Sequence, residues 1–201
     1  MKKIIAFEGM PGAGKTTMID IITKGSALPR CVNMPQLEIS RRIDNLRDDL
    51  VTSKFYLDAE RQKSAEIDNF FKKYDYILLD RTFLTTLAYC YARSKVENKK
   101  NQYRELLSYF DWIEKNNFLI IPDHVICLYL SIEESISRRV GFSKVKKYHY
   151  WFDSKFLYYF LEFYNKKNMA KFKIPKITFI NVTKLSVDLL TERVLGLVKE
   201  K

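Results

Sequence analysis

Residues 9–16, GMPGAGKT, constrain what this chain can fold into more than any other stretch of its sequence. They satisfy the pattern G-x-x-x-x-G-K-[ST], with the apolar run KIIAFE before them and the helical pattern KTTMIDIITK from Lys15 onward. A glycine-rich loop between a strand and a helix turns tightly and points its backbone N–H groups at phosphate oxygens. We therefore expect a phosphate-binding loop that takes ATP or GTP. The alternative, a chance lysine in a glycine-rich turn, fits four fixed positions poorly.

The chemistry of this loop gives its residues distinct roles. Lys15 supplies a mobile positive charge to the β- and γ-phosphates, and the Thr16 hydroxyl is placed to coordinate Mg²⁺. We assign seven residues to the nucleotide site: Gly9, Gly12, Ala13, Gly14, Lys15, Thr16 and Thr17. The expected cofactors are ATP and Mg²⁺.

Short apolar runs alternate with helical patterns along the whole chain. Runs typical of strands covered on both faces occupy residues 3–8, 30–34, 74–80, 123–130 and 176–181. Helical patterns cover residues 15–24, 53–73, 82–95, 101–116 and 186–200, the last with Ser186 as its expected N-cap. This alternation predicts an α/β fold, a five-stranded parallel sheet flanked by helices. Because we find no linker or repeat, we expect residues 1–201 to form one domain.

Composition narrows the classes of ligand. The chain carries a formal net charge of +11, with Lys and Arg scattered among 24 acidic residues. Such mixing favours small phosphorylated ligands over nucleic acid, because nucleic-acid modules tend to gather basic residues in one stripe. Cys31, Cys90 and Cys127 lie far apart without a CxxC pair, so we expect free thiols and no zinc site. No apolar run approaches the ~20 residues of a membrane helix, and we expect a soluble, cytoplasmic protein.

Asp80 and Arg81 stand where the predicted strand 74–80 ends. Open α/β sheets bind ligands at the carboxyl ends of their strands. An aspartate there can hold Mg²⁺ through a bound water, and an arginine can bind a phosphate with two hydrogen bonds. The alternative is an ordinary helix N-cap followed by a solvated arginine.

A basic segment after SIEESIS suggests a lid over the phosphates. Arg138 and Arg139 end this predicted helix, and the chain then turns at Gly141 into FSKVKKYHY. We expect a lid around residues 138–152 that contributes Arg138 or Arg139 to the transferred phosphate, since phosphoryl transfer depends on charge neutralisation. The alternative is two arginines that simply complement a helix C-terminus.

Residues 146–164 are rich in aromatic side chains. Apolar spacing over residues 156–164 predicts a helix packed on the sheet. Tyr148, Tyr150 and Trp151, just before it, are candidates to close over a base.

Four segments resemble the thymidylate kinase and deoxynucleoside kinase superfamily of P-loop kinases. They are FEGMPGAGKTT (7–17), FYLDAERQKSAEI (55–67), YILLDRTFLTTLAY (76–89) and PDHVICLYLSIEESISRRV (122–140). The resemblance implies a P-loop NTPase fold of the nucleoside monophosphate kinase type. It also implies transfer of the γ-phosphate of ATP, with Mg²⁺, to a (deoxy)nucleoside monophosphate. Arg61 and Arg81 would bind the acceptor, although Arg61 could equally belong to a solvated helix face. Because related enzymes are often dimers, the resemblance allows a homodimer.

The chain departs from the family pattern on the acceptor side. Pro11 stands where an acidic residue is usual, Leu57 where an aromatic residue often stacks on thymine, and Cys90 where a glutamine is expected. Phe55 lies close to Leu57, and we include both among the candidate substrate-binding residues. The sequence therefore leaves the base and the sugar of the acceptor open.

A nucleoside acceptor is the alternative among enzymes. Residues 34–38, MPQLE, partly resemble the deoxynucleoside kinase stretch in which a proline precedes the catalytic glutamate. The strict match is Gln36, which cannot take a proton, and Glu38 is the candidate base. A monophosphate needs positive charge instead, which Arg41, Arg42 and Arg61 would supply. The alternative of another class is a basic P-loop protein that acts as a nucleotide switch or binds nucleic acid.

Overall fold

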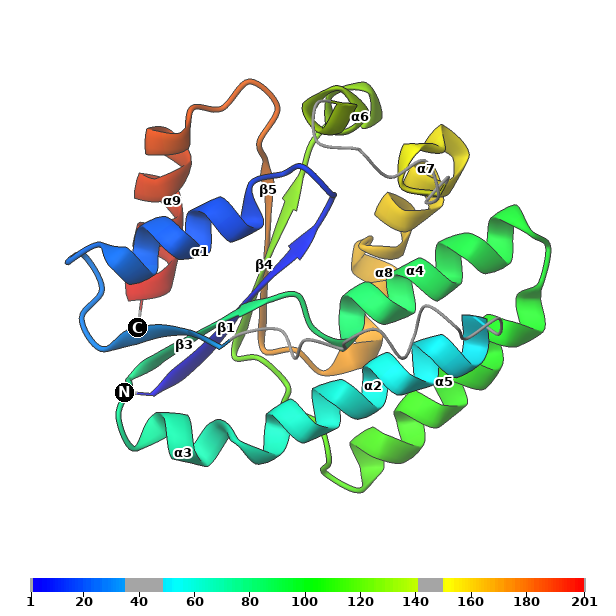
Figure 1. Cartoon of the computed structure of the whole chain (residues 1–201), viewed down its shortest axis with the longest axis horizontal. Helices are drawn as coiled ribbons and strands as arrows, with labels where there is room; N and C mark the ends of the chain where they lie inside the picture. The colour runs from blue at the N-terminus through cyan, green and yellow to red at the C-terminus, as the bar shows by residue number, and fades with distance from the viewer. Residues whose placement is uncertain (1, 35–48, 141–149, 201) are drawn as a thin grey trace.

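The computed structural model describes residues 2–34, 49–140 and 150–200. Their five strands form one parallel sheet, as the sequence predicts. The strand order is β2-β3-β1-β4-β5 (Figure 1). The strands are β1 (Lys3–Gly9), β2 (Cys31–Met34), β3 (Tyr76–Asp80), β4 (His124–Tyr129) and β5 (Lys176–Asn181). The phosphate-binding loop therefore leaves the central strand of the sheet.

Helices flank this sheet. They are α1 (Lys15–Lys24), α2 (Asp49–Ala65), α3 (Ile67–Phe71), α4 (Phe83–Val96), α5 (Lys100–Lys115), α6 (Ile132–Val140), α7 (Ser154–Phe163), α8 (Lys166–Met169) and α9 (Val187–Lys199), with short 3-10 turns η2 (Tyr150–Phe152) and η3 (Ala170–Phe172). Helices α1 and α9 pack together on one side, and α2, α4, α5 and α7 group on the other (Figure 1). The central strands are buried on both faces, which explains their unbroken apolar runs.

The helix boundaries follow the predicted patterns with one main difference. The first helix ends at Gly25, and Ser186 caps α9 by accepting a hydrogen bond from Leu189 N, both as predicted. The single helix predicted over residues 53–73 begins earlier, at Asp49, and is divided into α2 and α3 at Glu66. At Glu66 the backbone N–H bonds the carbonyl of Lys63, three residues back, and this tighter turn ends α2.

Helix α7 buries the aromatic face that its spacing predicts. Phe156, Phe160 and Phe163 are fully buried, and α7 packs along α4. Tyr150 and Trp151 join this cluster, with ring centroids 5.3 and 5.4 Å from that of Phe156. Both rings pack against the apolar surface of α7. That they close over a base stays a prediction. Tyr148 lies outside the described residues.

The cysteines and the helix lengths agree with the composition. Cys90 and Cys127 are buried, Cys31 is half-buried, and all three are free thiols. In the described parts of the chain, no helix combines the length and the apolarity that crossing a bilayer requires.

Candidate active site

The loop between β1 and α1 has the backbone that its glycines were expected to permit. Gly9, Gly12 and Gly14 adopt φ values of 104°, 75° and 86°. A Cβ on Gly9 would lie 2.2 Å from the carbonyl oxygen of Leu128, and Gly14 is the N-cap of α1. The loop thus runs against β4 and delivers the N-terminus of α1 to the carboxyl edge of the sheet, where backbone N–H groups attract an anion.

Lys15 is folded back onto this loop. Its Nζ donates to the carbonyl oxygens of Gly9 at 3.1 Å and Met10 at 2.7 Å, and the residue is 5% exposed. Burial, reinforced by the charge of Arg81, lowers the pKa of Lys15 to about 7, although Asp80 and Glu8 act in the opposite direction. A phosphate beside Nζ would favour the charged form, so the site gains a full positive charge when its anion arrives.

Thr16 and Asp80 form a pair suited to a magnesium ion. Thr16 Oγ1 donates to Asp80 Oδ2 at 2.5 Å, while Asp80 Oδ1 is buried without a hydrogen-bond partner. A hydroxyl and an orphaned carboxylate oxygen, completed by waters and phosphate oxygens, are a usual Mg²⁺ ligand set. When bound, the ion would be held by Thr16 and Asp80 and would supply positive charge beside the phosphates. Within the described ranges, no three His, Cys, Asp or Glu side chains gather into an all-protein metal site.

Arg81 occupies a strained position directly after β3. Its φ of 71° lies in the left-handed region, and its N–H donates to Phe7 O at 3.1 Å. Arg81 Nη1 donates to Thr85 Oγ1 at 3.4 Å. Thr82, not Asp80, caps α4 by accepting from Leu84 N. The alternative interpretation of Asp80 as an N-cap is therefore wrong, and Asp80 is available to a ligand.

The two lid arginines point to different parts of the site. Arg138 Nη1 donates to Gly12 O at 3.3 Å, and its Nη2 donates to Val182 O at 3.4 Å. Arg139 Nε donates to Ser135 O at 2.9 Å, and its guanidinium lies 4.8 Å from the ring centroid of Phe152. Burial and then the charge of Arg81 lower the pKa of Arg139, and both arginines line the same cavity.

Helix α6 is tied to the phosphate-binding loop. Ser135, fully buried in its first turns, donates from Oγ to Pro11 O at 2.8 Å. Glu134 holds Arg138 through a hydrogen bond of 2.5 Å. The arginines are thus fixed relative to the loop by the helix itself. Residues 141–149 of the predicted lid lie outside the described residues.

A cavity of about 440 Å³ opens beside these groups. It is lined by Gly12, Ala13, Gly14, Lys15, Thr16, Thr17, Met18, Arg81, Arg138, Arg139, Val182, Leu185, Val187 and Leu190. Its polar half is the loop with the arginines. Its apolar half comes from Val182 and Leu185 in the connection between β5 and α9, and from Val187 and Leu190 in α9. Sequence patterns did not mark these four residues as part of the site, because only the sheet order brings β5 beside β4 and the loop.

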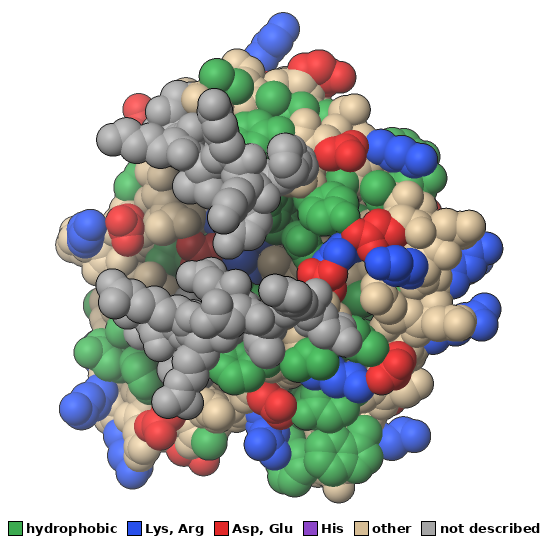
Figure 2. Space-filling model, turned by 45° about the vertical axis from the view of Figure 1, so that its right-hand side comes forward, with side chains coloured by type: hydrophobic (Ala, Val, Ile, Leu, Met, Phe, Trp, Pro, Cys, Tyr) green, Lys and Arg blue, Asp and Glu red, His purple; other side chains and the backbone are tan. Residues whose placement is uncertain are grey.

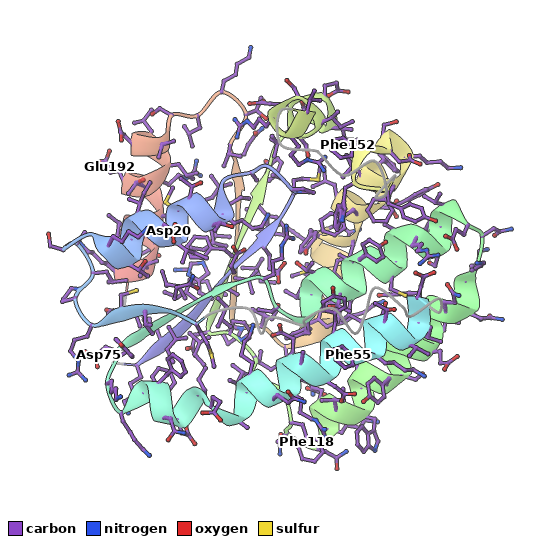
Figure 3. The ribbon with its side chains drawn as sticks, viewed as in Figure 1. Asp20, Phe55, Asp75, Phe118, Phe152 and Glu192 are labelled. Atoms are coloured by element: carbon purple, nitrogen blue, oxygen red, sulfur yellow. The ribbon has the colours of Figure 1, made fainter. Side chains whose placement is uncertain are left out.

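The structure does not bring all of the predicted acceptor residues together. Arg61 Nε lies 3.7 Å from Asp58 Oδ1, and its guanidinium sits 5.7 Å from the ring centroid of Phe118, which attracts the cation. Phe118 belongs to the connection that leads into the amino end of β4 (Figure 3). Arg61 is therefore held by contacts with Asp58 and Phe118, and its expected contact with the acceptor stays a prediction.

The remaining acceptor candidates fall in three different settings. Leu57 lies on the inward face of α2 and is fully buried in the core. It therefore does not present to a ligand the surface that was expected from the sequence. Phe55 is 41% exposed on the same helix (Figure 3). Glu38, with Arg41 and Arg42, lies outside the described residues, so its proposed role as a base stays a prediction.

Glu8 is a residue beside the site to which no role was assigned from the sequence. Glu8 is fully buried at the end of β1, and its carboxylate accepts hydrogen bonds from Thr82, Thr85 and Tyr164. An acidic residue that closes an otherwise apolar strand was the available signal. A buried charge needs such compensation, so its presence beside the loop calls for an explanation.

Comparison with known proteins identifies the family. No protein-family model matches the chain. A probable thymidylate kinase 1 from Saccharolobus solfataricus is 30% identical over 146 residues, which cover 69% of this chain and 70% of that protein. The chain belongs to the thymidylate kinase and deoxynucleoside kinase superfamily of P-loop kinases.

Solved structures from this superfamily share the whole fold. A thymidylate kinase from Candida albicans superposes with a TM-score of 0.72 at 20% identity, covering 98% of this chain and 91% of that one. A deoxyadenosine kinase from M. mycoides, solved with bound dATP, gives a TM-score of 0.72 at 18% identity and covers 100% of both chains. The fold of this P-loop kinase is therefore common to enzymes named for two different acceptors.

Proposed function

We propose that this P-loop kinase transfers the γ-phosphate of ATP, with Mg²⁺, to a (deoxy)nucleoside monophosphate. The observation that carries the proposal is the convergence of Lys15, Arg81 and Arg139 on one cavity. All three line it, and burial, followed by the charge of Arg81, lowers the pKa of the other two. Cations gather at such short range where they meet phosphates, because their mutual repulsion otherwise costs stability.

In this proposal the donor nucleotide lies along the cavity. Its phosphates bind the loop N–H groups and Lys15, and Mg²⁺ binds between Thr16 and Asp80. Its base lies against Val182, Leu185, Val187 and Leu190, with Arg138 beside it. A volume of about 440 Å³ and one apolar wall suit a ligand of this size.

Arg81 and Arg139 favour a phosphorylated acceptor. Both line the cavity, where Arg81 would bind the phosphate of the acceptor and Arg139 would stabilise the transferred group. A nucleoside acceptor would need a carboxylate that takes a proton from its hydroxyl. Among the described residues of the site, Glu8 is already saturated by donors, and Asp80 Oδ1 is suited to the metal. The nucleoside alternative therefore depends on Glu38.

The base of the acceptor is left to experiment. The name of the archaeal relative suggests thymidylate as a first candidate. The departures at Pro11, Leu57 and Cys90, however, fall on positions that the family uses for the acceptor.

The test is an acceptor screen with purified protein. ATP and Mg²⁺ are offered with each common nucleoside monophosphate and nucleoside, and ADP and the phosphorylated acceptor are quantified together. We expect one or a few monophosphates to be turned over, and Lys15→Ala to lower the rate by at least about 10³-fold. Lys24→Ala is the matched control, because Lys24 is an exposed residue at the other end of α1, near Asp20.

Other outcomes point to the alternatives. Phosphorylation of nucleosides alone would contradict the monophosphate proposal and direct attention to Glu38. ATP binding without any phosphorylated acceptor would contradict the kinase function and favour a nucleotide switch. Steep salt-dependent binding to polyanions would then favour nucleic acid. Figure 2 argues against that last outcome, since Lys and Arg on the face it shows are interspersed with acidic and apolar side chains.

A further inference from the structure

Glu8 is the most deeply buried carboxylate beside the site, and no role assigned so far uses it. Its Oε1 accepts from Thr82 N and from Thr82 Oγ1, both at 2.7 Å. Its Oε2 accepts from Thr85 Oγ1 at 2.6 Å and from Tyr164 Oη at 2.9 Å. Four donors from α4, from its N-terminal turn and from the residue after α7 thus converge on one side chain at 0% exposure.

The direction of these hydrogen bonds links Glu8 to Arg81. A threonine hydroxyl has one hydrogen, and Thr85 gives it to Glu8 Oε2. The lone pairs of Thr85 Oγ1 are therefore free to accept, and Arg81 Nη1 donates to this hydroxyl oxygen at 3.4 Å. The order of donation is Arg81 to Thr85 to Glu8, a chain in which a carboxylate orients a guanidinium through one hydroxyl.

Glu8 also holds the backbone on which Arg81 stands. Arg81 has a φ of 71°, a costly conformation for a residue that carries a Cβ. The N–H of Arg81 bonds Phe7 O on β1, and the next N–H, of Thr82, bonds Glu8 Oε1. Two consecutive peptide groups of the turn are thereby fixed to consecutive residues of the central strand. Strain of this kind persists where the surrounding structure enforces it.

We propose that Glu8 is a positioning residue for Arg81, and that Thr85 transmits its effect to the guanidinium. The inference rests on the proposed function, in which Arg81 binds the phosphate of the acceptor. Holding the arginine before the acceptor arrives removes the cost of ordering a long side chain during the reaction. Tyr164 completes the carboxylate's shell from the residue that follows α7.

Thr85 offers the cleanest test, because Thr85→Val removes the hydroxyl and keeps the shape. Glu8 itself is unsuitable, since an amide in its place would turn a donor toward existing donors. In Thr85→Val we expect kcat/KM for the acceptor to fall about tenfold and the KM for ATP to stay within about twofold. Thr85→Ser keeps the hydroxyl and should restore the rate. Thr86→Val, the same change one residue along α4, is the matched control.

A double-mutant cycle asks whether Thr85 acts through Arg81. On an Arg81→Met background, Thr85→Val should cause no further loss, because the group it orients is gone. Losses that multiply in the double variant would overturn the inference. An equal loss in Thr86→Val would overturn it as well.

A measurement without substrate separates this inference from the proposed function. NMR of labelled arginine side chains reports rotation about the Nε–Cζ bond. A hydrogen bond that Nη1 donates slows this rotation. We expect slow rotation at Arg81 in the wild type and in Thr86→Val, and faster rotation in Thr85→Val. If the wild type phosphorylates no acceptor, the proposed function fails while this result still decides the network. Unchanged rotation in Thr85→Val would overturn it.

Discussion

At the scale of single residues, the main feature of the site is that several cations line one cavity. Lys15 is buried against carbonyl oxygens, and the charge of Arg81 lies near both Lys15 and Arg139. Such a cluster is held ready for an anion, because the anion relieves the repulsion among its members. Protonation and substrate binding should therefore be coupled.

Nucleotide binding is expected to take up a proton on Lys15. Burial and then the charge of Arg81 lower the pKa of Lys15 from its ordinary value of 10.5 to about 7, so at pH 8 the amine is mostly neutral. A bound triphosphate should raise that pKa and draw in about one proton. Calorimetry of ATP binding at pH 8, in two buffers with different ionisation enthalpies, measures this uptake. Identical heats in the two buffers would contradict the prediction, and Lys15→Met should abolish the difference.

Arg138 and Arg139 should differ in kinetic effect because they point to different groups. Arg139→Ala should lower kcat by about 10³-fold with little change in the KM for ATP, since Arg139 lines the cavity together with Arg81 and would stabilise the transferred group. Arg138→Ala should instead raise the KM for ATP by about tenfold, since Arg138 bonds Gly12 O and Val182 O beside the donor cavity. Steady-state kinetics with ATP varied at saturating acceptor distinguishes the two. Similar losses in both variants would refute the division of roles.

At the scale of elements, the aromatic face of α7 holds the group of helices opposite α1 and α9 together. Phe160→Ala should lower the free energy of unfolding by about 3–5 kcal/mol, because a fully buried ring leaves a cavity against α4. Tyr158→Ala, on the exposed face of the same helix, should change it by less than about 0.5 kcal/mol. Urea unfolding measures both, and equal losses would show that the packing is not what stabilises α7.

The end of α4 carries an ionic cluster that should set the acid stability. Glu97 accepts from Tyr150 and Arg93 and forms an ion pair with Lys99. Burial raises the pKa of Glu97, but these contacts outweigh it and lower the pKa from 4.5 to about 2. A carboxyl group with a depressed pKa stabilises the fold above pH 4.5, and this stabilisation is lost as the pH falls toward 2. We expect Glu97→Gln to flatten the stability of the protein between pH 4.5 and 2, measured by urea unfolding. An unchanged pH profile would contradict the assignment.

At the scale of the whole molecule, ligand binding should stabilise the entire fold. The nucleotide cavity is built from the loop after β1, α1, the residue after β3, α6, the connection from β5 to α9 and the first turn of α9, so unfolding of the domain must release the ligand. ATP with Mg²⁺ at 100 times its Kd should add about 2.7 kcal/mol, which corresponds to a rise in Tm of roughly 5–10 °C. Thermal unfolding with and without nucleotide measures it, and Lys15→Ala should lose most of the shift. A shift that survives in Lys15→Ala would place the nucleotide elsewhere.

The sequence by itself determined the layers of the fold and the donor half of the site. The unbroken apolar runs of β1, β3 and β4 follow from burial on both faces, and the loop pattern of residues 9–16 specifies its own backbone. Both signals are local, so they are readable without knowing what lies nearby. The same holds for Asp80 and Arg81, whose place at a strand end was enough to put them at the carboxyl edge.

Only the tertiary structure decided where the longer side chains point. Arg61 and Leu57 were placed by resemblance, yet α2 directs one toward Phe118 and buries the other in the core. The network of Glu8, Thr85 and Tyr164 joins residues up to 156 positions apart. The apolar wall formed by Val182, Leu185, Val187 and Leu190 meets the phosphate-binding loop from the other end of the chain. Contacts of this range depend on which strands lie side by side and on how each helix is rotated. Local pattern carries neither, because hydrophobic periodicity says which face is buried but not what it meets.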